Sequence, residues 1–166
     1  MTWHLRDATP QDRSAICALH AHSWRRTYAE TLPAEALDAS LDDMMKAKWG
    51  ARDFALPDFG LIAEDGGVAI GFVYVLSGRE PPLIDNLHIA TDRQSRGIGS
   101  ALLTAAFDRL RALGATDAML TVLSGNERGM TFYRRMGGRE IAPVHGAILG
   151  HSVVERRMVF DLGASE

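Results

Sequence analysis

The sequence predicts an α/β fold in which helices cover a mixed β-sheet, and three observations lead to this expectation. The 166-residue chain is 46% hydrophobic, which suffices for one domain with a substantial core. Short β-branched runs such as VAIGFVYVL alternate with longer stretches of helical periodicity. The clearest helical stretch runs from Ile98 to Leu113 and ends at Gly114, a residue type that commonly follows a helix. We therefore expect a single layered domain spanning residues 1–166.

The expected elements follow one another in the order β-αα-β-β-β-α-β-α-β. After a first strand, WHLRDA, a helix begins with Thr9 as its N-cap and Pro10 in its first turn, and helical segments then start at Pro33 and after Ser40. The stretches FGLIAE and VAIGFVYVL are predicted strands joined by a tight turn at residues 65–67. The remaining predictions are a strand PLIDNLHIA, the helix from Ile98, a strand DAMLTVLS, a helix NERGMTFYRRM and a strand VVERRMVFDL, with REIAP as one further candidate strand.

Composition excludes several classes of function. The net charge of −3 and the pI of about 6.1 argue against a nucleic-acid-binding protein, which would carry a basic surface. No apolar run approaches the roughly 18 residues of a membrane span, and the first ten residues lack the apolar centre of a signal peptide. Cys17 is the only cysteine, so neither an internal disulfide nor a cysteine-rich metal site is expected. The sequence predicts a cytoplasmic protein with no metal and no membrane association.

A glycine-containing turn, DRQSRGIGSALL, joins a predicted strand to the predicted helix from Ile98. Gly97 and Gly99 lack the Cβ atoms that would block a ligand, and the N–H groups that open a helix attract anions. Arg93 and Arg96 add positive charge, so the turn is a candidate phosphate-binding site, although a tight turn without a ligand explains two glycines equally well. A dinucleotide fingerprint would need a third glycine where Leu102 stands, and a Walker loop would need a Gly-Lys-Ser/Thr tripeptide that the sequence lacks.

The stretch from Gln94 to Gly99 fits the pattern Q/R-x-x-G-x-G/A, and with it the chain resembles the GNAT family, the GCN5-related N-acetyltransferases. The resemblance covers almost the whole chain in element order and is most specific over residues 83–137. It implies the acyl-CoA N-acyltransferase (GNAT) fold and an enzyme that uses acetyl-CoA as co-substrate, with its pyrophosphate on the glycine turn. The cofactor-binding residues that it implies are Leu87, His88, Ile89, Gln94, Ser95, Arg96, Gly97, Ile98, Gly99, Ser100, Asn126 and Tyr133.

A second motif, TVLSGNERGMTFYRRMG, supports the same resemblance. Asn126 is a predicted helix N-cap, and the matching asparagine of the family contacts the pantetheine arm of the cofactor. Tyr133 matches the family tyrosine that protonates the departing CoA thiolate, a reasonable role for a phenol near developing negative charge. The alternative for Tyr133 is a ring packed in the core. The sequence departs from the family at Gly138, which stands where an aromatic residue usually follows the glycine at position 137.

The general base is less clearly indicated. Strand alternation predicts that Leu83, Asp85, Leu87 and Ile89 share one face, with His88 packed on the opposite face. The family's histone-acetylating members carry a glutamate that aligns with Leu83, so that base is absent. Asp85, two residues further on, becomes the leading candidate, either directly or through water; the alternative is a structural carboxylate that holds a backbone N–H or an arginine.

The acceptor pocket is indicated only by aromatic spacing and charge. Trp24 and Tyr28 lie four residues apart on one predicted helical face, where they could line an acceptor pocket or pack in the core. Five acidic residues and no Lys or Arg lie between Ala29 and Met45, which could attract a cationic amine or form a solvated helix face.

The resemblance implies direct acetyl transfer to a primary amine of a small molecule or peptide in a ternary complex. Cys17, on the first predicted helix, lies away from the motif, so no covalent enzyme intermediate is expected. Family members are often dimers, which makes a homodimer one expected arrangement. Two alternatives stay open: a non-catalytic acyl-CoA-binding or regulatory module on the same fold, and a preference for a longer acyl-CoA.

Overall fold

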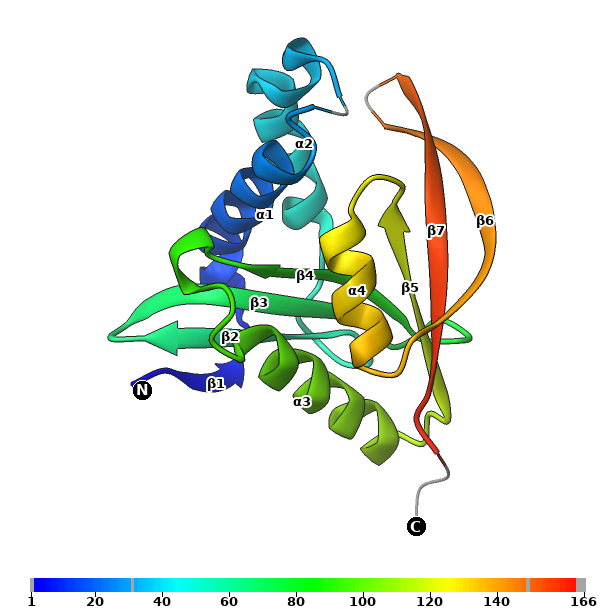
Figure 1. Cartoon of the computed structure of the whole chain (residues 1–166). Helices are drawn as coiled ribbons and strands as arrows, with labels where there is room; N and C mark the ends of the chain where they lie inside the picture. Colours follow the sequence, from blue (N-terminus) through cyan, green and yellow to red (C-terminus); the bar gives the residue numbers. More distant parts are fainter. Residues whose placement is uncertain (1, 31, 149, 164–166) are drawn as a thin grey trace.

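A seven-stranded mixed sheet, with strands in the order β1-β2-β3-β4-β5-β7-β6, forms the centre of the protein. The computed structural model describes residues 2–30, 32–148 and 150–163, and Figure 1 shows their arrangement. The predicted element order is confirmed, and REIAP begins an additional strand. The strands are β1 (His4–Asp7), β2 (Phe59–Asp65), β3 (Val68–Leu76), β4 (Leu83–Ile89), β5 (Asp117–Leu123), β6 (Arg139–Ile148) and β7 (His151–Asp161). The α-helices are α1 (Arg13–Thr27), α2 (Ala39–Ala51), α3 (Ile98–Ala112) and α4 (Glu127–Arg135), and short 3-10 turns occupy residues 10–12, 34–37 and 91–93.

Helix α3 forms where the apolar periodicity predicts it, but it is shorter by one residue. Its buried side chains recur every three or four positions, so that one face packs against the sheet. Leu113, expected on this face, is 49% exposed because the helix ends at Ala112. Gly114 follows with a φ of +91°, a left-handed conformation that glycine adopts readily.

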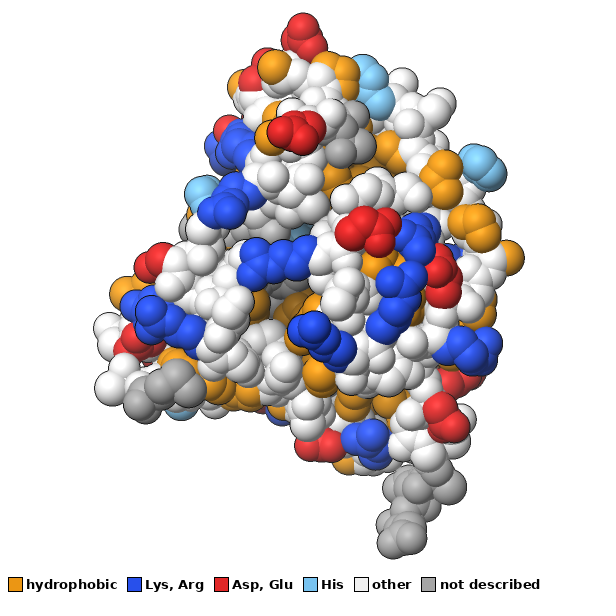
Figure 2. Space-filling view, viewed as in Figure 1, with side chains coloured by type: hydrophobic (Ala, Val, Ile, Leu, Met, Phe, Trp, Pro, Cys, Tyr) orange, Lys and Arg blue, Asp and Glu red, His pale blue; other side chains and the backbone are white. Residues whose placement is uncertain are grey.

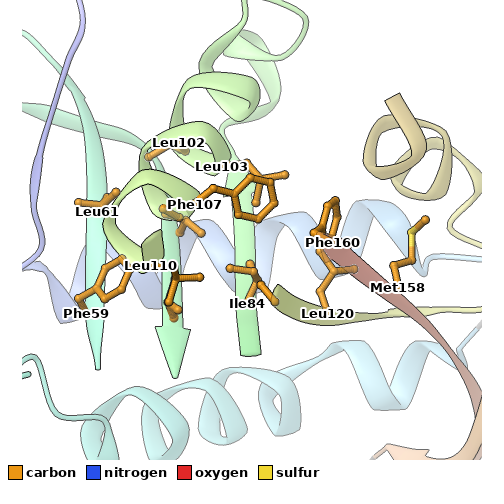
Figure 3. Close-up of a cluster of buried hydrophobic side chains, with 14 of the residues drawn as sticks. Phe59, Leu61, Ile84, Leu102, Leu103, Phe107, Leu110, Leu120, Met158 and Phe160 are labelled. Atoms are coloured by element: carbon orange, nitrogen blue, oxygen red, sulfur yellow. The ribbon is translucent and has the colours of Figure 1, made fainter. Parts of the chain in front are cut away.

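Two apolar clusters cover the two faces of strands β2 to β4. On one face, side chains of β2, β4, β5 and β7 point toward those of α3, with Phe107 and Phe160 in ring contact at 4.9 Å between centroids (Figure 3). On the other face, α1 packs through Ile16 and α2 through Trp49, Met45 and Leu41, all of which are 1% exposed or less. The sheet is thereby a middle layer, with α3 on one face and α1 and α2 on the other.

Strands β4 and β5 lie side by side in the middle of the sheet but pair only at their beginning. They are parallel, with Leu83 opposite Met119, and the Met119 N–H donates to the Pro82 carbonyl at 2.9 Å. Beyond this point the two strands diverge, as the different directions of β4 and β5 in Figure 1 show. The facing edges of the two strands are therefore open to a ligand.

A β-bulge in β4 makes the predicted alternation of this strand wrong. Tyr74 of β3 pairs with Asn86, whereas its neighbour Val75 pairs with Ile84, so that Asp85 is the extra residue. The expected common face of Leu83, Asp85, Leu87 and Ile89 is broken, since one inserted residue reverses the faces on either side of it. Ile84 joins the α3-side cluster and Leu83 packs on the α1–α2 side.

Gly138 sits in a space that leaves no room for a side chain. A Cβ at this position would lie 2.9 Å from the Tyr133 carbonyl oxygen and 3.0 Å from both the Met158 methyl and the Phe160 ring. The departure from the family pattern at position 138 is therefore matched by close packing of β7 against the end of α4.

Candidate active site

A cleft of about 1230 Å³ opens where β4 and β5 diverge. Its walls come from β4, the turn before α3, β5, α4, and the end of α1. Figure 2 shows Lys and Arg side chains around a hollow on this face of the molecule. The predicted site residues that line the cleft are Trp24, Tyr28, Asp85, Leu87, His88, Ile89, Gln94, Ser95, Gly97, Ile98, Gly99, Ser100, Asn126 and Tyr133. Arg96 is exposed and is not part of the cleft wall.

The glycine turn presents unpaired backbone N–H groups at the start of α3. The first hydrogen bond of the helix runs from the Ala101 N–H to the Gly97 carbonyl, so the N–H groups of residues 98–100 precede the intrahelical ladder. Ser95 and Gly97 both have positive φ values, +65° and +79°. A Cβ at Gly97 would meet no protein atom within 4 Å, so this position is open toward the cleft. The turn can accept an anion such as a pyrophosphate.

Tyr133 lies on α4 with its ring packed and its hydroxyl unpaired. The ring contacts Phe132 edge-on at 5.3 Å between centroids. Its hydroxyl has no hydrogen-bond partner among the described residues, and the residue lines the cleft. Burial, with a smaller contribution from Tyr28, raises the pKa of Tyr133 well above its usual range, so the phenol keeps its proton at neutral pH. The hydroxyl is thereby available as a proton donor inside the cleft.

Asn126 caps α4 as predicted, and the predicted aromatic pair stands nearby. The Asn126 side-chain oxygen accepts from the Gly129 N–H at 3.0 Å. Trp24 and Tyr28 contact each other edge-on at 5.1 Å between ring centroids, and both line the cleft. Burial raises the pKa of Tyr28 to about 12. Tyr28 packs against Leu123, as the packing alternative expects, and it also lines the cleft, whereas an acceptor-binding role for the pair stays a prediction.

Asp85 lines the cleft, and its negative charge is paired with two cationic side chains. Its Oδ2 atom accepts from Arg52 at 2.6 Å and from the Asn86 side chain at 2.9 Å, and lies 3.3 Å from the Lys48 ammonium. Burial lowers the pKa of Lys48, although Asp85 opposes that shift. The Oδ1 atom has no hydrogen-bond partner among the described residues. Asp85 therefore holds an arginine, as the structural alternative expects, and it also lines the cleft, whereas its role as a general base stays a prediction.

Two stacked histidines close the inner wall of the cleft. The rings of His20 and His88 lie 4.5 Å apart between centroids. The Trp49 indole donates to His20 Nδ1 at 3.1 Å, and His88 Nδ1 lies 2.8 Å from the Ser23 hydroxyl. Burial, reinforced by the Lys48 charge, lowers the pKa of His88 to about 3, and burial likewise lowers the pKa of His20. The pair is neutral at physiological pH. His88 therefore packs on the α1–α2 face, as predicted, and also borders the cleft.

A family model described as the acetyltransferase (GNAT) family matches residues 17–138. The chain belongs to this family. Its glycine turn, Asn126 and Tyr133 all fall within the matched segment.

Individual GNAT proteins resemble the chain over most of its length. It is 25% identical to the uncharacterized N-acetyltransferase YuaI of Bacillus subtilis over 151 residues, which are 88% of this chain and 86% of YuaI. A GCN5-related N-acetyltransferase of Rhodopseudomonas palustris superposes with a TM-score of 0.79 at 24% identity, covering 97% of this chain and 96% of that one. The PaiA N-acetyltransferase of Thermoplasma acidophilum, solved in complex with coenzyme A, gives a TM-score of 0.77 at 18% identity, covering 97% and 99%. These likenesses support the GNAT fold.

Several polar or charged cleft residues of this GNAT chain were not predicted from the sequence. Among them, Ser23, Lys48 and Glu155 lie outside the two quoted motifs, and Thr121 begins the second motif without having been singled out. The acidic residues between positions 29 and 45, in contrast, do not line it. One of them, Asp42, pairs with Arg25 at 2.9 Å, which agrees with the reading of a solvated helix face.

Other candidate groups lie outside the GNAT site. Cys17 contacts the Met45 carbonyl on the α1–α2 side and is not part of the cleft wall. His145 and His151 belong to β6 and β7, and neither lines the cleft. Within the described ranges, no three His, Cys, Asp or Glu side chains are grouped as a metal site would require. None of the described helices is long and apolar enough to cross a membrane.

The glycine turn allows a test with an internal control. We expect Gly97→Leu to weaken acetyl-CoA binding at least tenfold, about 1.4 kcal/mol, because the new side chain would project into the open space above the turn. Gly114→Leu is the matched control, since Gly114 also has a positive φ and open surroundings but stands at the other end of α3. Both variants carry backbone strain of about 1 kcal/mol. Titration calorimetry with acetyl-CoA measures the difference; equal affinities for the two variants would rule out a ligand on this turn.

Proposed function

We propose that the protein transfers an acetyl group from acetyl-CoA to a primary amine of a small molecule or peptide, by direct attack in a ternary complex. One observation carries the proposal: a cleft between two unpaired strand edges joins an anion-binding turn to an unpaired, protonated phenol. This arrangement suits a long ligand with phosphates at one end and a reacting thioester at the other.

The residues of the cleft fit acetyl-CoA. The N–H groups at the start of α3 would hold the pyrophosphate, and Gly97 leaves space for it. The open edges of β4 around residues 87–89 and of β5 would bind the pantetheine arm, together with Asn126. When bound, acetyl-CoA supplies an acyl thioester whose carbonyl carbon is attacked by the amine.

Side chains of this protein would carry out the two proton transfers of the reaction. The Tyr133 hydroxyl donates a proton to the leaving sulfur and stabilises its developing charge. The amine nitrogen must be neutral before it attacks, and Asp85 is the proposed proton acceptor through its free Oδ1 atom, directly or through water. Arg52 and Lys48 hold this carboxylate in position.

Direct attack is favoured over a covalent enzyme intermediate. Cys17 is the only cysteine, its thiol contacts a backbone carbonyl of α2, and burial raises its pKa, so the reactive thiolate is disfavoured. No cleft residue takes its place as an activated thiol nucleophile. The amine and the thioester would therefore have to meet in the cleft at the same time.

A panel of amines with acetyl-CoA, monitored by release of free thiol, tests the function. We expect CoA to be released faster with at least one primary amine than by hydrolysis alone. A non-catalytic acyl-CoA-binding module would instead retain acetyl-CoA in calorimetry and release no thiol with any amine. Propionyl-CoA and butyryl-CoA in the same assay report whether a longer acyl group is preferred.

A further inference from the structure

Among the described residues, three carboxylates line the cleft, and one of them has no ion-pair partner. Asp85 is paired with Arg52 and Lys48, and Glu127 is paired with Arg156 at 2.8 Å. Glu155 has neither an ion pair nor a hydrogen bond from its side chain to any described residue. A half-buried carboxylate without a partner is costly unless a cation comes to it.

The arginines that follow Glu155 in the sequence do not neutralise it. Strand alternation turns Arg156 to the opposite face of β7, where it binds Glu140 at 2.7 Å and Glu127 at 2.8 Å. Arg157 shares the face of Glu155, but its guanidinium donates to the Ala142 carbonyl at 2.8 Å. The carboxylate is thus left free although two arginines adjoin it in the chain.

The sheet register places Glu155 beside the aromatic pair of α1. Glu155 pairs with Leu123 of β5, and paired residues share a face of the sheet. Leu123 packs against Tyr28, and the charge of Glu155 reaches Tyr28 as one of the influences that raise the pKa of its phenol, burial being the largest. On the β6 side, a Cβ at Gly146 would lie 3.9 Å from the Glu155 carboxyl carbon, so the missing side chain keeps this flank open.

We propose that Glu155 binds the ammonium group of the acceptor, which makes it a specificity-determining residue for cationic amines. The inference rests on the proposed function, because it assigns the acceptor end of the same cleft. A carboxylate near Tyr28, whose ring contacts Trp24, offers an ammonium both an ion pair and an aromatic face. Ile148 and Val153, which pack in the same cluster, make the surroundings apolar. The matching acceptor is a primary ammonium carried on an apolar or aromatic body.

The surroundings of Asp85 are less suited to hold the ammonium. Asp85 brings one negative charge, whereas its partners Arg52 and Lys48 bring two positive ones, so positive charge is in excess around this carboxylate. The carboxylate of Glu155, which has no cation paired with it, therefore attracts an ammonium more strongly than Asp85 does. Binding at Glu155 and proton transfer at Asp85 are therefore separate tasks.

The test uses the CoA-loaded protein with two probes of similar shape, benzylammonium chloride and the neutral benzyl alcohol. We expect Glu155→Gln to weaken benzylammonium binding at least tenfold in titration calorimetry, and to leave benzyl alcohol binding unchanged. Glu127→Gln is the matched control, because it makes the same substitution at a cleft carboxylate that already has a partner. It should bind benzylammonium nearly as the wild type does.

Three binding results would overturn the proposal. The wild-type protein could bind benzylammonium no more tightly than benzyl alcohol, or the Glu155→Gln variant could keep wild-type affinity for benzylammonium. The third result is an equal loss of affinity in the Glu155→Gln and Glu127→Gln variants. The binding measurement does not require acetyl transfer. If the wild type acetylates no amine but Glu155→Gln still loses benzylammonium selectively, the proposed activity is wrong and the ammonium site stands. If transfer occurs with unchanged KM for benzylamine in Glu155→Gln, the activity stands and the ammonium site is wrong.

Discussion

Tyr133→Phe should lower kcat by about a hundredfold while leaving acetyl-CoA affinity near that of the wild type. The variant keeps the ring, and with it the contacts with Phe132 and Phe160, but removes the only group of this side chain that could donate a proton. Steady-state kinetics with an accepted amine measure kcat, and calorimetry measures acetyl-CoA binding. Because burial raises the pKa of Tyr133, the wild-type phenol should also stay protonated at pH 10, so kcat should show no alkaline loss from this group.

Tyr74→Phe is the control for this substitution. Tyr74 also has a pKa raised by burial, to about 12, but its hydroxyl donates to the Asp53 carbonyl and the residue does not line the cleft. That variant should lose stability and retain kcat. A Tyr133→Phe enzyme with full kcat would leave Tyr133 with a packing role alone.

Acid should destabilise the protein through the two stacked histidines before the carboxylates begin to titrate. A histidine whose folded-state pKa is depressed contributes stability that is present above its unfolded value of 6.5 and is lost as the pH falls toward the folded value, here about 3 for His88. At pH 5 the loss is about 2 kcal/mol for each histidine. Urea unfolding at pH 7.5 and pH 5 should therefore give free energies of unfolding that differ by roughly 2–4 kcal/mol.

Substitution separates the pair from other titrating groups. His20→Gln keeps an acceptor for the Trp49 indole and should roughly halve the loss of stability between pH 7.5 and pH 5. His145→Gln, at an exposed position on β6, should leave that loss unchanged. His88→Gln provides a second variant on the other ring. Equal stability of the wild type at the two pH values would contradict buried neutral histidines.

The fold was predictable from local signals because each element carries its own pattern. The apolar repeat of α3 and the glycine pair between β2 and β3 depend on neighbouring residues alone, and both appear where expected. The β-bulge at Asp85 could not be predicted, because LIDNLHI has no glycine or proline to mark it. The bulge depends on the register with β3, which is a property of two strands together.

The residues of the candidate site could be predicted where they belong to a short motif. They could not be predicted where the site depends on contacts between segments that are distant in the sequence. Gly97 and Gly99 of the glycine turn, Asn126 and Tyr133 belong to short motifs, and all four line the cleft, although Arg96 of the same turn does not. The charged partners of Asp85 are Lys48 of α2 and Arg52, the residue after this helix, both more than thirty residues earlier in the chain. The free carboxylate of Glu155 was hidden for the opposite reason, because its sequence neighbours suggest ion pairs that the strand geometry prevents.

The divergence of β4 and β5 makes the centre of the sheet, rather than its rim, the place where backbone pairing is incomplete. Within the part of the chain that the structure describes, the β1–β4 half and the β5–β7 half are joined between β4 and β5 by the pairing of Leu83 with Met119, supported by the bond to Pro82. An extended ligand could form hydrogen bonds with the unpaired backbone groups of both β4 and β5, and it would thereby replace the strand pairing that is missing there. Ligand binding would then also clamp the two halves of the protein together, with a gain in stability that grows with the logarithm of the ligand concentration. The free energy of unfolding of the protein would in this way depend on the concentration of acetyl-CoA.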